Sequence, residues 1–140
     1  MRRSLWLVPL ALLSVLAVAG PSADSPCDAL WQHRNLGKAF YENPTTQQLA
    51  VDEFKKALDL APQSARERVN YGLSLLRAAK TQQGIDELER AKIQDPAIPH
   101  IWFNLGIAHK KAAQYDKAIA EFEQMVKLVP GEPTSHYTLG

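Results

Sequence analysis

Four histidines and one cysteine are the side chains of this chain best suited to metal binding or catalysis. His33, His100, His109 and His136 form no His-x3-His pair and no glutamate-bearing metal motif, and Cys27 is not spaced from any of them as a zinc pair would be. The sequence also has no glycine-rich phosphate loop, no Gly-x-Ser-x-Gly elbow and no carboxylate pair in a setting typical of general acid and base catalysis. We therefore expect no enzymatic activity, no metal and no cofactor.

Acidic side chains recur at related places along the chain. The three pairs are Asp52 with Glu53, Asp86 with Glu87, and Glu121 with Glu123. We interpret all of them as exposed helix-surface charge.

Three asparagines provide chemistry suited to binding. Asn35, Asn70 and Asn104 lie at nearly equal intervals, and each precedes a Leu-Gly or Tyr-Gly pair. A side-chain amide both donates and accepts hydrogen bonds, so a row of such amides could bind an extended peptide backbone. The alternative is that these asparagines support only local structure, and the sequence leaves both open.

An internal repeat must position these side chains, because Pro62, Pro96 and Pro130 recur at equal intervals. Each proline closes a segment with two amphipathic stretches separated by a short polar break, which predicts a helical hairpin. The first segment fits only with one extra residue in the 43–46 stretch. We expect Ser64 and Glu67 to form a capping box. Thr45 or Thr46, and Thr81, are the expected N-caps of second helices.

Glycine recurs at one position of each first helix, although glycine inside a helix costs about 1 kcal/mol relative to alanine. The residues are Gly37, Gly72, Gly106 and Gly140. Close approach of the paired helix would explain them, with the first three facing Ala50, Gly84 and Ala118. We expect Phe54, Leu88 and Phe122 to fill the space between hairpins.

This pattern resembles the tetratricopeptide repeat family, whose unit of about 34 residues reads Trp-x2-Leu-Gly-x2-Tyr, then Ala-x3-Phe, then Pro. The third repeat matches best, through Trp102, Leu105, Gly106, Ala118, Phe122 and Pro130. The second departs most, with Arg68 in place of tryptophan. The resemblance implies an all-α fold, an α-solenoid of antiparallel helical hairpins. Its repeats would span about 29–63, 64–98 and 99–132, and residues 133–140 would begin a fourth.

The resemblance also implies a concave groove lined by the first helices, in which the asparagines would lie. The candidate groove residues are Asn35, Asn70, Asn104, Arg34, Lys38, Arg66, Arg77, Phe103 and Lys110, with Val69, Leu73, His100, Ile107 and Lys111 beside them. The family's carboxylate clamp for chaperone tails would need lysine and arginine where His100 and Asn104 stand. That disfavours a chaperone-tail receptor.

The N-terminus predicts export. Arg2 and Arg3 precede a mostly apolar run from Leu5 to Ala19 that ends in Ala-Val-Ala, which is typical of a cleaved signal peptide over residues 1–19. We expect a linker over 20–28 and a periplasmic or secreted protein. The alternative is an uncleaved anchor in the inner membrane, the only case in which we expect membrane attachment.

Composition limits the partner class. The chain has 16 basic and 15 acidic residues, so without Arg2 and Arg3 the balance is 14 to 15, too even for the basic field that binds nucleic acid. We predict an interaction scaffold that binds a peptide or partner protein. The alternative is the N-terminal recruiting arm of a larger exported enzyme or of a β-propeller or carbohydrate-binding protein. The in-register start of a fourth repeat favours a longer protein.

Overall fold

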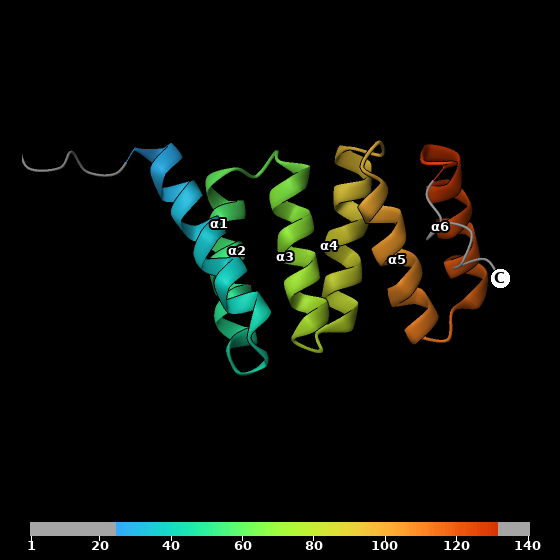
Figure 1. Cartoon of the computed structure of the whole chain (residues 1–140), viewed down its shortest axis with the longest axis horizontal. Coiled ribbons are helices and arrows are strands. Elements are labelled where there is room, and N and C mark those ends of the chain that lie inside the picture. The colour runs from blue at the N-terminus through green and yellow to red at the C-terminus, as the bar shows by residue number, and fades with distance from the viewer. Residues whose placement is uncertain (1–24, 132–140) are drawn as a thin grey trace, which may run out of the picture.

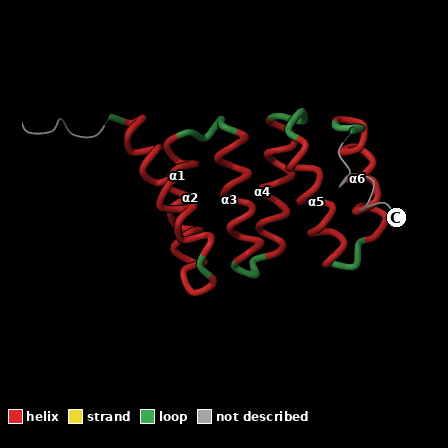
Figure 2. Tube along the Cα trace, in the orientation of Figure 1, coloured by secondary structure: helices red, strands yellow, loops and turns green. Residues whose placement is uncertain are grey.

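The computed structural model describes residues 25–131, which form paired helices standing side by side in a row (Figure 1). These are α1 (Pro26–Glu42), α2 (Gln47–Leu60), α3 (Ala65–Arg77), α4 (Thr81–Gln94), α5 (Pro99–Lys111) and α6 (Tyr115–Leu128). A short 3₁₀ helix, η1 (Pro44–Thr46), joins α1 to α2. Helices and loops account for all of residues 25–131, and the loops alternate between the upper and lower ends of the helices (Figure 2).

The hairpins pair as predicted, α1 with α2, α3 with α4 and α5 with α6. The all-α solenoid of three hairpins is therefore confirmed, and η1 lies where the first repeat needed an extra residue. The expected signal peptide and fourth-repeat start fall outside the described residues. Over residues 25–131, no helix combines the length and apolar character needed to cross a membrane.

Helix α1 begins earlier than expected, inside the stretch assigned to a linker. Ser25 caps it: the hydroxyl accepts from the Asp28 amide at 3.2 Å, and the Asp28 carboxylate accepts from the Ser25 amide at 3.1 Å. This reciprocal capping box satisfies two free amides of the first turn. Residues 26–28 are consequently helical.

The predicted caps of the later helices are confirmed in part. Ser64 accepts from the Glu67 amide as expected, but the Glu67 carboxylate is fully buried and pairs with Arg34, so the capping box is half formed. Thr46 is the N-cap of α2, as predicted, although it makes no side-chain cap hydrogen bond. Lys80, not Thr81, is the N-cap of α4, because the turn through Ala79 already fixes the start of that helix.

The turns inside the second and third hairpins are the same. Ala79 and Ala113 have φ of 60° and 59°, the left-handed conformation that usually selects glycine. The amide of Lys80 donates to the Leu75 carbonyl and that of Gln114 to the His109 carbonyl, both at 2.9 Å. Each turn is a Schellman motif that closes the first helix and starts the second.

The helical glycines do permit close approach, but of partners other than those predicted in two of three hairpins. A Cβ added at Gly37 would lie 2.7 Å from the Phe54 ring, and one at Gly106 would lie 2.4 Å from the Phe122 ring. Phe54 and Phe122 therefore pack against the glycine of their own hairpin. The prediction that these glycines face alanine was wrong, because the large ring one turn further along occupies the space.

The second hairpin behaves as predicted, since Gly72 and Gly84 face each other. A Cβ on Gly84 would lie 2.9 Å from the Gly72 carbonyl oxygen. Beside this contact, a core of buried apolar side chains joins the second and third repeats: Val69, Ile85, Leu88, Ala91, Ile101, Leu105 and Ala108.

The acidic side chains of the second helices are not all exposed, which corrects the sequence interpretation. Glu53, Glu87 and Glu121 occupy the same position of successive repeats, and their side chains are only 13%, 13% and 11% exposed. Glu53 pairs with His33 at 2.6 Å and Glu87 with Arg68 at 2.8 Å. In each case the partner comes from the first helix of the same hairpin. Trp102 occupies that partner position in the third hairpin and cannot play this role.

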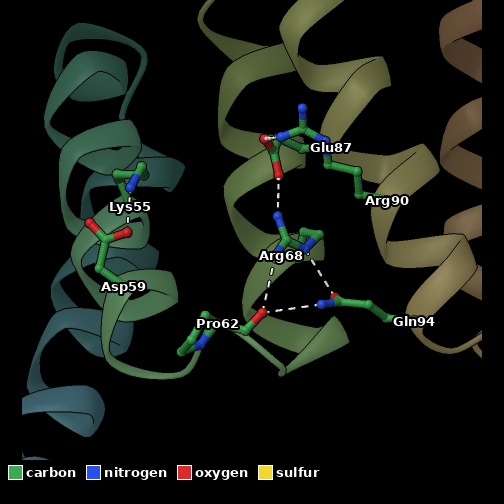
Figure 3. Close-up of polar contacts among 7 residues, drawn as sticks. All are labelled: Lys55, Asp59, Pro62, Arg68, Glu87, Arg90 and Gln94. Carbon is green, nitrogen blue, oxygen red and sulfur yellow. Dashed lines mark hydrogen bonds and ion pairs between the residues drawn. The ribbon is translucent and has the colours of Figure 1, made fainter.

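Burial raises the pKa of the Glu53 carboxyl, but hydrogen bonds from Lys56 and His33 outweigh it, so the net effect lowers that pKa. Arg68 shows how such a pair also holds the loop between repeats (Figure 3). Its guanidinium donates hydrogen bonds to the Glu87 carboxylate, to the Gln94 side chain at 3.0 Å and to the Pro62 carbonyl at 3.0 Å.

Candidate peptide-binding groove

The first helices α3 and α5 lie against each other, and two depressions run along the surface they share. One, of about 400 Å³, is lined by Arg66, Val69, Asn70, Leu73, Ile98, His100 and Asn104. The other, of about 210 Å³, is lined by Tyr41, Leu73, Leu76, Arg77, Thr81, Asn104, Ile107, Ala108 and Lys111. Because Leu73 and Asn104 line both, the depressions are adjacent. We call them together the α3–α5 groove.

Two of the three asparagines meet in this groove. Asn70 and Asn104 both line its larger part. The Asn104 amide nitrogen donates to the His100 carbonyl at 2.7 Å, which fixes the side chain along its own helix and leaves the amide oxygen to accept from a ligand. Asn35 is exposed on α1.

Of the predicted basic residues, some line the groove and others lie on exposed helix surfaces outside its lining. Arg66 and Arg77 line the groove, while Lys38 and Lys110 are exposed on α1 and α5. The Arg77 guanidinium lies 4.8 Å from the Tyr41 ring centroid, a cation–π contact that orients it.

Arg34 is engaged within the fold. Its Nε and Nη2 donate to Glu67 Oε1 at 2.9 and 2.5 Å, which joins α1 to α3. Glu67 is 0% exposed, so this pair neutralises a buried charge between the first and second repeats. Phe103 is half-buried, with its ring centroid 6.3 Å from that of Phe122.

The groove lining combines apolar and basic character. The residues lining these two depressions include arginine, lysine and histidine but no aspartate or glutamate. Val69, Leu73 and Ile107 supply apolar surface between the asparagines and the basic side chains. Such a lining suits an extended chain that presents apolar and acidic side chains.

Five lining residues were not among the sequence candidates: Tyr41, Leu76, Thr81, Ile98 and Ala108. Thr81 and Ile98 lie at helix junctions, where the turn geometry decides which side chains reach the groove. Tyr41 stands one residue beyond the Leu-Gly-x2-aromatic motif of the first repeat, and its place in the groove follows from how the first hairpin packs on the second.

Comparison with known proteins supports this architecture. Residues 99–132 match the sequence family described as tetratricopeptide repeat. The tetratricopeptide domain of Arabidopsis OM64 is 21% identical with a TM-score of 0.75, over 81% of this chain and 93% of that one. The Sgt2 domain of Aspergillus fumigatus is 20% identical with a TM-score of 0.74, over 86% and 80% of the two chains.

A third similar structure contains a bound peptide. The second tetratricopeptide domain of human RPAP3, in complex with the HSP70 peptide SGPTIEEVD, is 16% identical with a TM-score of 0.73. The match covers 82% of this chain and 95% of that chain.

Proposed function

We propose that the α3–α5 groove binds an extended segment of a partner protein. The match of residues 99–132 to the tetratricopeptide repeat family and the fold shared with tetratricopeptide domains support this. In this proposal the chain is a non-catalytic interaction scaffold. The observation that carries it is the convergence of Asn70 and Asn104 in one apolar, basic groove. Recognition of a peptide by the similar RPAP3 domain supports the same use of the fold.

Three kinds of contact would hold the peptide. The two asparagine amides would bond its backbone, Val69 and Leu73 would receive apolar side chains, and Arg66 and Arg77 would attract acidic ones. A chaperone-tail receptor stays disfavoured, because neither His100 nor Asn104 supplies a fixed positive charge. The proposed partner is a peptide of mixed acidic and apolar character.

A test can start without a known partner. Linear peptides selected from a random phage-displayed library against the chain would be measured against the Asn70→Ala/Asn104→Ala variant by fluorescence anisotropy. We expect at least tenfold weaker binding with unchanged helical circular dichroism. Gln83→Ala, an exposed change on second helix α4, is the matched control and should bind normally. Equal affinity of the double variant and the wild type would reject the groove as the binding site.

We also propose that the protein is exported, on the basis of the basic start and apolar run over residues 1–19. Expression of the chain in a bacterium, followed by fractionation and N-terminal sequencing, tests this. Recovery from the periplasm with a new N-terminus after Ala19 is expected. An intact chain in the cytoplasmic fraction would contradict export, and an intact chain in the membrane fraction would favour the anchored alternative.

A further inference from the structure

A polar cluster lies where the second repeat meets the third, apart from the groove-lining residues. It contains Glu89 and Lys92 of α4, His109 of α5 and Glu121 of α6. Lys92 Nζ contacts Glu89 Oε2 at 2.6 Å and Glu121 Oε1 at 2.9 Å. The ammonium thus engages one oxygen of each carboxylate and leaves the other oxygen of each outside these contacts.

Two buried polar atoms of the cluster lack hydrogen-bond partners. His109 is 3% exposed, and within residues 25–131 its Nε2 and Glu121 Oε2 are buried without a hydrogen bond. Glu89 Oε1 lies 3.7 Å from His109 Nε2, too far for a hydrogen bond. Buried polar atoms normally have partners, so these two atoms point to a missing ligand in the cluster.

Gln114 determines which histidine nitrogen is available. His109 Nδ1 lies 2.9 Å from Gln114 Oε1, and an amide oxygen can only accept, so Nδ1 is the donor in this contact. Nε2 is then the ring nitrogen that faces the carboxylates of Glu89 and Glu121. A histidine that donates one N–H to a supporting oxygen and offers its other nitrogen is the usual arrangement of a metal ligand.

We propose that His109 Nε2, Glu89 and Glu121 bind a divalent transition-metal ion of the zinc class. One ligand atom from each of the three side chains lies within 4.8 Å of the other two. Bonds of about 2.0–2.2 Å place neighbouring ligands of tetrahedral zinc roughly 3.4 Å apart, so the site must contract on binding. Glu89, whose side chain is 38% exposed, has room to move inward. An imidazole ligand favours zinc-class ions over calcium or magnesium, which prefer oxygen ligands.

Lys92 acts as a built-in competitor for this ion. Two carboxylates and one ammonium leave the cluster with one net negative charge, whereas a divalent ion beside Lys92 would make it positive. The ammonium lies 5.1 Å from the Trp102 ring centroid, a contact that can hold the lysine as it withdraws from the carboxylates. Removal of this ammonium should therefore strengthen metal binding.

The experiment is calorimetric titration of the full chain, without a polyhistidine tag, with Zn²⁺, alongside Co²⁺ absorption spectra. We expect one ion per chain, and at least tenfold weaker Zn²⁺ binding for His109→Gln and for Glu121→Gln. His33→Gln is the matched control, because His33 also pairs with a half-buried glutamate, and it should bind as the wild type does. Mg²⁺ should give no signal.

Lys92→Met separates ligand loss from misfolding, since it is expected to bind Zn²⁺ more tightly than the wild type. Misfolding would not produce that gain. The proposal is overturned if the wild type binds no stoichiometric Zn²⁺, if His109→Gln binds as well as the wild type, or if Lys92→Met binds no more tightly. The metal-site proposal and the peptide-groove proposal can be rejected independently, because the two sites share no residue.

Discussion

The second and third repeats fix their connecting loops with different chemistry. Arg68 Nη2 donates to the Pro62 carbonyl at 3.0 Å, and Trp102 Nε1, one repeat later, donates to the Pro96 carbonyl at 2.8 Å. The hydrogen bond from a side chain to the loop carbonyl is kept, although the donor changes from a charged to an aromatic group. The least regular repeat of the sequence is thus structurally equivalent to the most regular one at this position.

The two repeats differ in what happens to the buried glutamate. Arg68 neutralises Glu87 within its own hairpin, whereas Trp102 cannot neutralise Glu121. Glu121 pairs instead with Lys92 of the preceding repeat. An aromatic residue at this position therefore moves the charge pairing to the junction between repeats, next to His109.

The largest difference between the repeats should appear at their helical glycines. Gly106→Ala would force a Cβ to 2.4 Å from the ring of Phe122, which is 2% exposed. We expect it to lower the free energy of unfolding by about 3 kcal/mol. At Gly72 the nearest side-chain atom would be 3.0 Å away, so Gly72→Ala should change stability by less than about 1 kcal/mol after its gain in helix propensity.

Urea denaturation of both variants measures this contrast. Equal destabilisation would show that the aromatic ring of the third hairpin is no more rigid than Leu88 in the second.

The loop contacts should differ in their dependence on salt. Trp102→Ala is expected to cost about 2 kcal/mol at any ionic strength, because it removes mainly apolar contact. Arg68→Ala should cost about 1 kcal/mol at low salt and less at high salt, because screening weakens the lost ion pair. Urea denaturation at both salt concentrations tests this. The same salt dependence for both variants would contradict the assignment of charge to one repeat and apolar contact to the other.

The turns inside the two hairpins should respond alike. Ala79 and Ala113 both adopt a left-handed conformation that costs an alanine about 1–2 kcal/mol. Replacement of either by glycine should stabilise the chain by about 0.5 kcal/mol, after the larger entropy of glycine in the unfolded state is subtracted. Thermal unfolding would show two small, similar increases in Tm, and a decrease for either variant would contradict the Schellman geometry.

The smallest effect concerns acid sensitivity in the first repeat. The net pKa of Glu53 is lowered, so its pairing stabilises the fold above the unfolded carboxyl pKa of about 4.3. This stability is lost as pH falls through the lower folded-state pKa. Glu53→Gln should flatten the acid limb of the stability–pH profile by only about 0.3 kcal/mol, while exposed Asp52→Asn should not. Identical profiles for the wild type and Glu53→Gln would exclude this contribution.

The repeat period made much of the fold predictable. It identified the hairpins, placed Gly72 opposite Gly84, and singled out Asn70 and Asn104, which line one groove. The period does not tell how far one hairpin rotates against the next. That packing turns Arg34 toward Glu67. Nor does the period tell how the two helices of one hairpin meet, which brings the Phe122 ring onto Gly106.

The proposed metal site could not be predicted from the sequence either, because the repeat period does not tell how the helices pack. Glu89, His109 and Glu121 come from three helices, at spacings that match no single-helix motif. His109 stands where the tetratricopeptide pattern has tyrosine, so the pattern gives no hint of a metal ligand there. Only the packing of α6 against α5, and of α5 against α4, brings the three side chains together.

The most direct test of peptide binding in the α3–α5 groove is a two-dimensional ¹H–¹⁵N NMR titration with the tightest peptide from the random library. The account predicts that the largest shift changes fall on the side-chain amides of Asn70 and Asn104 and on the backbone around Leu73. Shift changes confined to the second helices α2, α4 and α6 would contradict it.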